Sequence, residues 1–171
     1  MTSPSHELRL VPLPIAALEA LVADDLAAAS AAAGVTLTPY LVTQSWLWRI
    51  RLDQIAHDPV SIEWIARAAV DTATERVVGH VGFHGPPDER GMVEVAYSVD
   101  PEFRRRGYAT AMLRAALRWA ADAPDVAVVR ASISPENAAS LATLRPFGFE
   151  RVGEQWDEED GLELLFERPA R

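Results

Sequence analysis

Cysteine is absent from the 171 residues of this chain, and long apolar runs free of charge are absent too. Without cysteine there is no disulfide framework, no cysteine-based metal site and no thiol nucleophile. The alanine-rich stretch 15–33 contains Glu19, Asp24 and Asp25, which excludes a membrane span there. The N-terminal segment does not combine a basic region, an apolar run and a cleavage site, so we expect no signal peptide. We therefore expect a cytoplasmic location and no membrane partner.

Positive charge is also scarce. The 16 basic residues face 25 acidic ones, which gives a net charge of −9 and a pI near 4.9. A nucleic-acid-binding protein needs a broad basic face, so we expect no nucleic-acid partner. Long-range attraction would instead suit a cationic ligand such as an amine. With 49% hydrophobic and 24% charged residues, the length predicts a single domain over residues 1–171 with a substantial core.

Hydrophobic periodicity predicts an alternation of strands and helices. Short connections between several of the strands favour antiparallel neighbours. The expected strands are 7–12, 61–70, 76–83, 92–99, 126–133, 149–156 and 162–168. The expected helices are 15–33, with a break near 24–25, and 39–57, 108–121 and 138–145.

The most informative stretch is the join between strand 92–99 and the helix that begins at Tyr108. Arg104, Arg105, Arg106 and Gly107 lie in this join. A helix N-terminus offers unpaired backbone N–H groups and partial positive charge, and guanidinium groups match phosphate geometry. Glycine lets a ligand approach the backbone closely. The join therefore predicts a phosphate-binding loop, and the alternative is an ordinary turn with solvated arginines.

The pattern Arg104-x-x-Gly107-x-Ala109 resembles the [Gln/Arg]-x-x-Gly-x-[Gly/Ala] signature of the GNAT acyltransferase superfamily. The resemblance implies an α+β fold, with a mixed, mostly antiparallel sheet of about seven strands and helices on both faces. It also implies that the loop holds the pyrophosphate of acetyl-coenzyme A, while the pantetheine follows the strand before it. The cofactor residues implied in this region are Tyr97, Val99, Arg104, Arg105, Arg106, Gly107, Tyr108, Ala109 and Thr110.

A second segment strengthens the resemblance. Asn137 and Ser140, followed by Phe147-Gly148-Phe149, resemble the family segment that contacts pantetheine and phosphate; the alternative for Asn137 is an ordinary helix N-cap. Many family members have a tyrosine seven residues after this asparagine, which protonates the departing thiolate, but this chain has Leu144. The pattern resembles the branch that includes ribosomal-protein N-terminal acetyltransferases. The proton donor stays open among Tyr97, a water, Ser132 and Ser134, and the thiolate could also leave unassisted.

Glu94 is the candidate catalytic base. Strand alternation places it on one face with Ala96 and Ser98, where its carboxylate could accept a proton from an attacking amine. The alternative is a structural ion pair. His80 and His84 share a face of the neighbouring strand and could relay protons. No ligand spacing around them suggests a metal.

Two further features concern the acceptor. Trp46 lies opposite the core stripe of helix 39–57 and is a candidate for acceptor specificity together with His84, although a second buried face would equally explain it. The acidic turn 157–160 is either a solvated hairpin tip or an attractor of cations.

The resemblance implies an N-acetyltransferase that moves an acetyl group from acetyl-coenzyme A to a primary amine within a ternary complex, without a metal. The acceptor would be a protein N-terminus or a small molecule. One alternative is a non-catalytic acyl-coenzyme A sensor or regulatory subunit, and another is an unrelated domain that binds a different phosphate ligand. Exposed tryptophans, together with the resemblance to a family whose members commonly form dimers, predict a possible homodimer.

Overall fold

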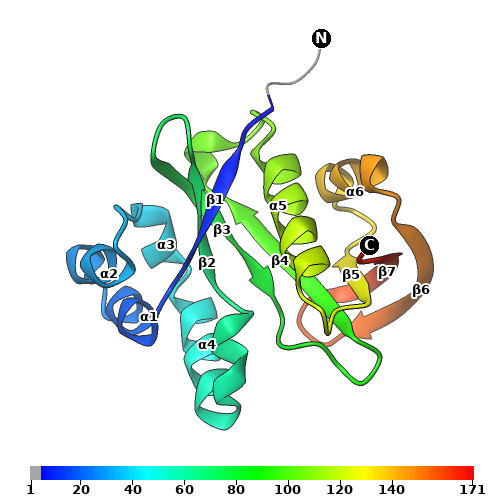
Figure 1. Ribbon diagram of the computed structural model, residues 1–171, viewed down its shortest axis with the longest axis horizontal. Helices are drawn as coiled ribbons and strands as arrows, with labels where there is room; N and C mark the ends of the chain where they lie inside the picture. The colour runs from blue at the N-terminus through cyan, green and yellow to red at the C-terminus, as the bar shows by residue number, and fades with distance from the viewer. Residues whose placement is uncertain (1–4) are drawn as a thin grey trace.

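Seven strands form one open, mixed sheet within residues 5–171, the part of the chain that the computed structural model describes (Figure 1). The order across the sheet is β1-β2-β3-β4-β5-β7-β6. All neighbours are antiparallel except β4 and β5, which confirms the expected α+β, mostly antiparallel architecture. The strands are β1 (Leu8–Pro12), β2 (Arg67–Asp71), β3 (Arg76–Phe83), β4 (Met92–Val99), β5 (Val128–Ile133), β6 (Glu150–Asp157) and β7 (Gly161–Pro169).

Helices cover both faces of the sheet, as expected (Figure 1). One core contains Leu18, Leu21 and Trp48, and it lies between the sheet and the first four helices. The other core contains Met112 and Leu113 and lies beneath the last two. The helices are α1 (Ile15–Val22), α2 (Leu26–Ala33), α3 (Pro39–Thr43), α4 (Ser45–His57), α5 (Tyr108–Asp122) and α6 (Ala138–Leu144), with 3₁₀ turns η1 (Pro59–Glu63), η2 (Pro101–Phe103) and η3 (Arg145–Phe147).

Helix α5 is the crossover between the two parallel strands. Its sequence places Met112, Leu113 and Ala116 on one face, and all three are fully buried. Burial of a methionine or leucine side chain contributes about 1.5–3 kcal/mol. Because a parallel pair needs such a crossover, the helix begins where β4 ends. The phosphate-loop candidate therefore lies at the carboxyl end of β4.

Several expected boundaries change. The strand expected over 61–70 is wrong for residues 61–66, because Ser61 and Asp58 hydrogen-bond to each other locally and form η1 after Pro59. The expected break near 24–25 is confirmed, and Asp25 caps α2 through its side chain. The helix expected over 39–57 divides at Gln44. Thr38 is the N-cap residue of α3, but its hydroxyl donates to Asp100 instead of capping.

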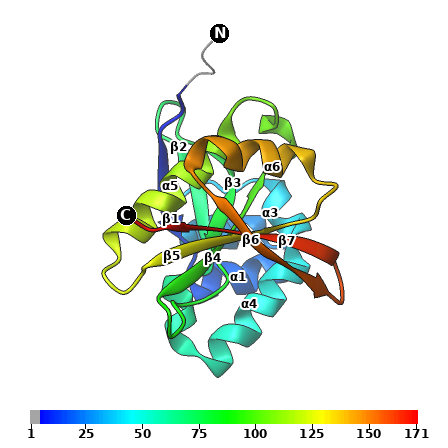
Figure 2. The same ribbon diagram turned by 90° about the vertical axis from the view of Figure 1, so that its right-hand side faces the viewer.

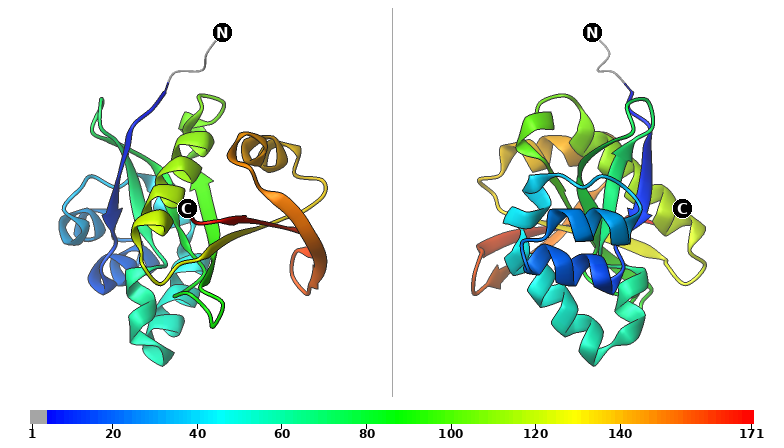
Figure 3. Two further views of the ribbon diagram at one scale, coloured as in Figure 1. Left: turned by 45° about the vertical axis from the view of Figure 1, so that its right-hand side comes forward. Right: turned by 90° about the vertical axis from the view of Figure 1, so that its left-hand side faces the viewer.

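Strands β4 and β5 separate soon after they meet. Their pairing runs from Met92 opposite Val128 to Glu94 opposite Arg130. Beyond that point the described residues show no further pairing between them, and β5 continues against β7 as far as Ile133 opposite Leu164. The left view of Figure 3 shows β6 and α6 standing away from β4, and Figure 2 shows β6 and β7 crossing in front of the other strands. One backbone edge of β4 is thus left open along residues 95–99.

At Gly79 the backbone of β3 leaves no room for a side chain beside the backbone of β4. The φ of Gly79 is +153°, and a Cβ there would lie 2.1 Å from the Ser98 carbonyl oxygen and 2.7 Å from Met112 Cε. We predict that Gly79→Ala lowers the free energy of unfolding by about 2 kcal/mol or more, since backbone must shift to admit the methyl group. Urea unfolding measures this loss. Gly153→Ala is the control, because no described atom lies within 4 Å of its Cβ position, and it should cost far less.

Candidate functional site

The loop before α5 has the backbone shape of an anion site. Arg105 and Gly107 both adopt left-handed conformations, with φ of +61° and +87°. Such alternation turns successive N–H groups toward one side, which forms an anion-binding concavity, and the positive end of α5 adds to it. The left-handed Arg105 costs about 1–3 kcal/mol, which the surrounding structure must offset. Arg104 Nε donates to the Val99 carbonyl over 3.1 Å and ties the loop to β4.

A cavity of about 590 Å³ opens over this loop and the free edge of β4. Ten of the eleven candidate cofactor residues line it. Arg106 does not: its guanidinium carbon lies 5.9 Å from the Phe103 ring. The lining residues are Tyr97, Ser98, Val99, Phe103, Arg104, Arg105, Gly107, Tyr108, Ala109, Thr110, Asn137, Ala139, Ser140 and Thr143.

The second candidate segment forms the opposite wall of the cavity. Asn137 Oδ1 accepts the Ser140 amide over 3.1 Å, so Asn137 is the N-cap of α6 and a wall residue at once. The Tyr97 phenol is largely buried, which raises its pKa, while the neighbouring Ser140 and Thr143 hydroxyls act in the opposite direction. Tyr97 is therefore protonated at neutral pH.

A smaller cavity of about 270 Å³ adjoins the first. The two share Tyr97, Asn137 and Ser140 in their linings. Within the described chain, the smaller lining holds three carboxylates and no arginine: those of Glu94 on β4 and of two residues from the hairpin β6–β7, Asp160 and Glu163. The acidic turn therefore reaches the site through Asp160, which the pattern of charges alone did not decide.

Glu94 and His84 come together at this cavity. Glu94 Oε1 lies 3.8 Å from His84 Nδ1, and the two side chains are 18% and 53% exposed. The backbone holds the pair in place, since the His84 amide donates to the Glu94 carbonyl over 2.8 Å. Helix α4 supports it as well: Gln54 Nε2 and Arg51 Nη1 donate to the His84 carbonyl over 2.7 and 3.2 Å. Sequence reasoning missed both supporting residues, because such contacts have no periodic signal.

His80 and Trp46 lie elsewhere. His80 is buried against the rings of Tyr40 and Trp48, opposite Ser98 in the sheet. Burial, with a further contribution from Arg51, lowers its pKa to about 4, so it is neutral at pH 7. Trp46 is 55% exposed, which excludes the second buried face, and it is not among the described residues that line either cavity.

The remaining candidate proton donors differ in placement. Ser132 lines the smaller cavity, and its buried hydroxyl has no hydrogen-bond partner among residues 5–171. Ser134 accepts the Glu136 amide over 3.4 Å and forms part of a turn. Leu144, where a tyrosine is common in the family, is buried and lines the smaller cavity.

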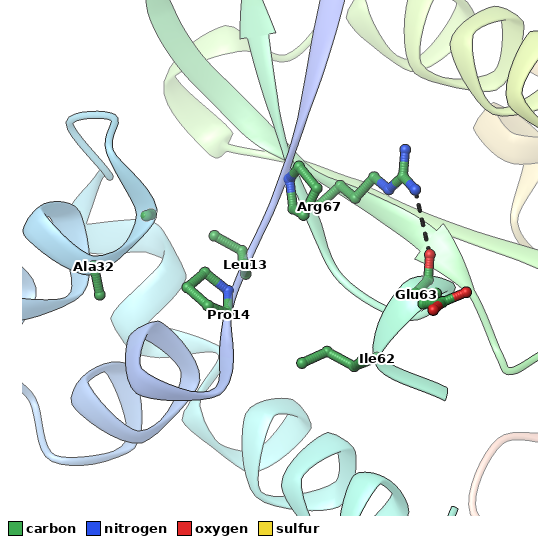
Figure 4. Close-up of a pocket in the computed structure, with 8 residues that line it drawn as sticks. Leu13, Pro14, Ala32, Ile62, Glu63 and Arg67 are labelled. Atoms are coloured by element: carbon green, nitrogen blue, oxygen red, sulfur yellow. Dashed lines mark hydrogen bonds between the residues drawn. The ribbon is translucent and has the colours of Figure 1, made fainter. Parts of the chain in front are cut away.

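A third cavity, of about 600 Å³, has a mostly apolar wall and lies between the end of β1, α2 and η1 (Figure 4). Arg67 in its lining donates to the Glu63 carbonyl over 3.3 Å and covers the Trp119 ring at 3.5 Å. None of the candidate site residues lines it in the described structure. Its described lining holds no carboxylate–imidazole pair such as that of Glu94 and His84.

Neither a metal cluster nor a membrane-spanning helix occurs in the described chain. Over residues 5–171, no three His, Cys, Asp or Glu side chains gather as metal ligands would. In the same range every helix is too short or too polar to cross a bilayer.

Comparison with known proteins agrees with the fold. Residues 7–150 match the model of the acetyltransferase (GNAT) domain family, and the chain belongs to this family. The uncharacterized N-acetyltransferase YjdG of Bacillus subtilis is 34% identical over 73 residues, which are 43% of this chain and 44% of that protein. The aligned segment thus spans less than half of that relative.

Solved structures share the fold over nearly the whole chain. RimJ of Mycobacterium smegmatis, solved with a coenzyme A disulfide, has a TM-score of 0.66 at 20% identity and covers 98% of this chain and 84% of its own. A ribosomal-protein-S5-alanine acetyltransferase of Vibrio fischeri has a TM-score of 0.62 at 16% identity, with 99% and 96% covered. Identities this low show a common fold.

The buried, neutral His80 predicts a pH-dependent stability. Its pKa of about 4 is below the ordinary 6.5. Above pH 6.5 the ring is neutral in both the folded and the unfolded state, so its contribution to stability is independent of pH. As the pH falls from 6.5 toward 4, the unfolded state binds a proton that the folded state does not, and the free energy of unfolding decreases. The full change is about 3 kcal/mol. Urea unfolding of the wild type and of His80→Gln at pH 7 and 4.5 measures it. The wild type should lose more stability than the variant on acidification, and a constant difference between the two would contradict the assignment.

Proposed function

We propose that this protein transfers an acetyl group from acetyl-coenzyme A to a primary amine. The observation that carries the proposal is the junction of two cavities at Tyr97, Asn137 and Ser140. One cavity has the backbone and arginines for a diphosphate, and the other has a carboxylate beside an imidazole. A thioester at the junction would face both.

The donor would bind along the open edge of β4. Its diphosphate would accept hydrogen bonds from the backbone N–H groups of Arg105 and Gly107. It would also form an ion pair with the guanidinium group of Arg104. Its pantetheine amides would pair with the free backbone of residues 97–99, in the manner of an added strand. Such pairing satisfies the polar backbone groups that the separation of β4 and β5 leaves open.

The reaction would be a direct attack within the ternary complex. The neutral amine adds to the thioester carbonyl carbon, and a backbone N–H near Val99 stabilises the oxyanion. Glu94 takes the ammonium proton, directly or through water. The carbon–sulfur bond then breaks, and the coenzyme A thiolate leaves and takes up a proton. Holding both substrates together supplies much of the rate.

The acceptor class follows from charge. The carboxylates of Glu94, Asp160 and Glu163 around one small cavity favour a cationic amine, which must lose a proton before it attacks. A small amine and a protein N-terminus both meet this requirement. The carboxylates of the smaller cavity would attract either of them in its protonated form. A cytoplasmic location and a homodimer both stay predictions.

Donor binding is the first test, with thermal unfolding as the readout. Acetyl-coenzyme A at a hundred times its Kd should add about 2.7 kcal/mol of stability, whereas ATP, a phosphate control, should add much less. Gly107→Val should abolish the stabilisation by acetyl-coenzyme A, because a side chain fills the loop at φ +87°. Gly34→Val is the matched control: it strains a similar left-handed site, φ +72°, at the end of α2, and its response to the ligand should be retained.

Glu94→Gln should lower kcat by about 10²–10⁴-fold, the usual contribution of a general base, and leave the Kd for coenzyme A unchanged. Glu154→Gln is the control, since Glu154 is an exposed partner of Arg151. Steady-state turnover with a panel of amines gives the rates. A full-rate Glu94→Gln enzyme would remove Glu94 from the mechanism. Coenzyme A binding without product from any amine would favour the non-catalytic sensor instead.

A further inference from the structure

His6, just before β1, contacts the candidate phosphate loop, which lies far from it in the sequence. Its Nε2 lies 2.8 Å from the carbonyl oxygen of Arg106, one hundred positions away. Its ring stacks on Tyr108, with 3.9 Å between centroids. Figure 1 shows the start of β1 beside the amino end of α5, where this contact occurs.

Asp71 links the same two residues to the sheet. The Tyr108 hydroxyl donates to Asp71 Oδ2 over 2.6 Å, and His6 Nδ1 lies 3.3 Å from that oxygen. The Ala73 amide donates to Oδ1 over 2.8 Å, which holds the carboxylate at the β2–β3 turn. Burial alone would raise the pKa of Asp71, but these hydrogen bonds and His6 lower it overall. Asp71 is therefore an ionised, buried anchor.

The nitrogens of His6 both face oxygen acceptors. The Arg106 carbonyl can only accept, so Nε2 carries a proton, and Nδ1 faces a carboxylate. The other charged groups around the cluster are Arg106 itself and Arg76, which act on the Tyr108 hydroxyl.

The contact controls the orientation of one peptide unit. Carbonyl and N–H of a trans peptide point in opposite directions. When His6 holds the Arg106 carbonyl on its own side, the Gly107 N–H points the other way. Gly107 lines the diphosphate cavity, whereas Arg106 does not. Arg105 and Gly107, the neighbours of Arg106 in the chain, are the left-handed residues of the loop, so this peptide lies within the candidate anion site.

We infer that His6 and Asp71 are positioning residues for the donor: together with Tyr108 they hold the Arg106–Gly107 peptide so that its N–H faces the diphosphate. The inference rests on the proposed function, because the diphosphate is that of coenzyme A. It assigns a role in donor binding to the segment before β1 and to the β2–β3 turn, neither of which contacts the reacting atoms.

Calorimetric titration of the 171-residue protein with coenzyme A tests the inference. His6→Phe retains a ring to stack on Tyr108 but loses both polar contacts, and we expect about a tenfold weaker Kd, the usual cost of one lost hydrogen bond. Asp71→Asn still accepts from Tyr108 without the charge and should weaken binding in the same direction. Arg9→Gln is the matched control: Arg9 is on β1 too but pairs with the exposed Glu75, and its Kd should equal that of the wild type.

Two readouts separate positioning from general destabilisation. In turnover, KM for acetyl-coenzyme A should rise in His6→Phe while kcat is retained. In the NMR spectrum, coenzyme A should move the Gly107 amide proton of the wild type downfield and move it less in His6→Phe. An unchanged Kd and an unchanged Gly107 shift in a folded His6→Phe protein would overturn the inference alone. A wild type that does not bind coenzyme A would overturn the proposed function, and this inference with it.

Discussion

The separation of β4 from β5 is the constraint on which the rest of the molecule depends. Backbone N–H and C=O groups rarely stay unpaired in a protein interior, yet the pairing of these strands stops at Glu94 opposite Arg130. The open edge can persist because a ligand or water can occupy it. Both cavities lie along this edge, and the parallel crossover places the start of α5 at its end.

Charge is divided along the same line. The protein as a whole carries a net charge of −9. The larger cavity nevertheless has Arg104, Arg105 and the positive end of α5 in its lining, while the smaller cavity has Glu94, Asp160 and Glu163. A polyanionic donor and a cationic acceptor would thus each meet complementary charge. The division also explains why bulk composition was a poor guide to the donor: a few fixed dipoles and guanidinium groups outweigh a distant excess of carboxylates.

Local patterns predicted most of the fold. Gly107 before an amphipathic helix predicted a turn at the start of α5, and the alternation in β4 predicted the face on which Glu94 lies. Both are local properties of backbone conformation and side-chain period. The errors fell where tertiary contacts compete with propensity. Residues 61–66 read as a strand, but the Asp58–Ser61 hydrogen bond bends the chain. The helix expected over 39–57 divides at Gln44, and the Thr38 hydroxyl at its N-cap position donates to the distant Asp100.

The sequence by itself determined the family and the α+β class, and it predicted the phosphate-binding loop and the face of β4 on which Glu94 lies. Each of these follows from residues that are close together in the chain. Only the tertiary structure decided that Asp160 and Glu163 join Glu94 in one cavity lining, and that His80 is enclosed by Tyr40 and Trp48. It also brought His6 to Arg106 and Asp71 to Tyr108. Those contacts join segments far apart in sequence, and they form because the sheet order and the paths of the hairpins bring them together, which no local periodicity encodes.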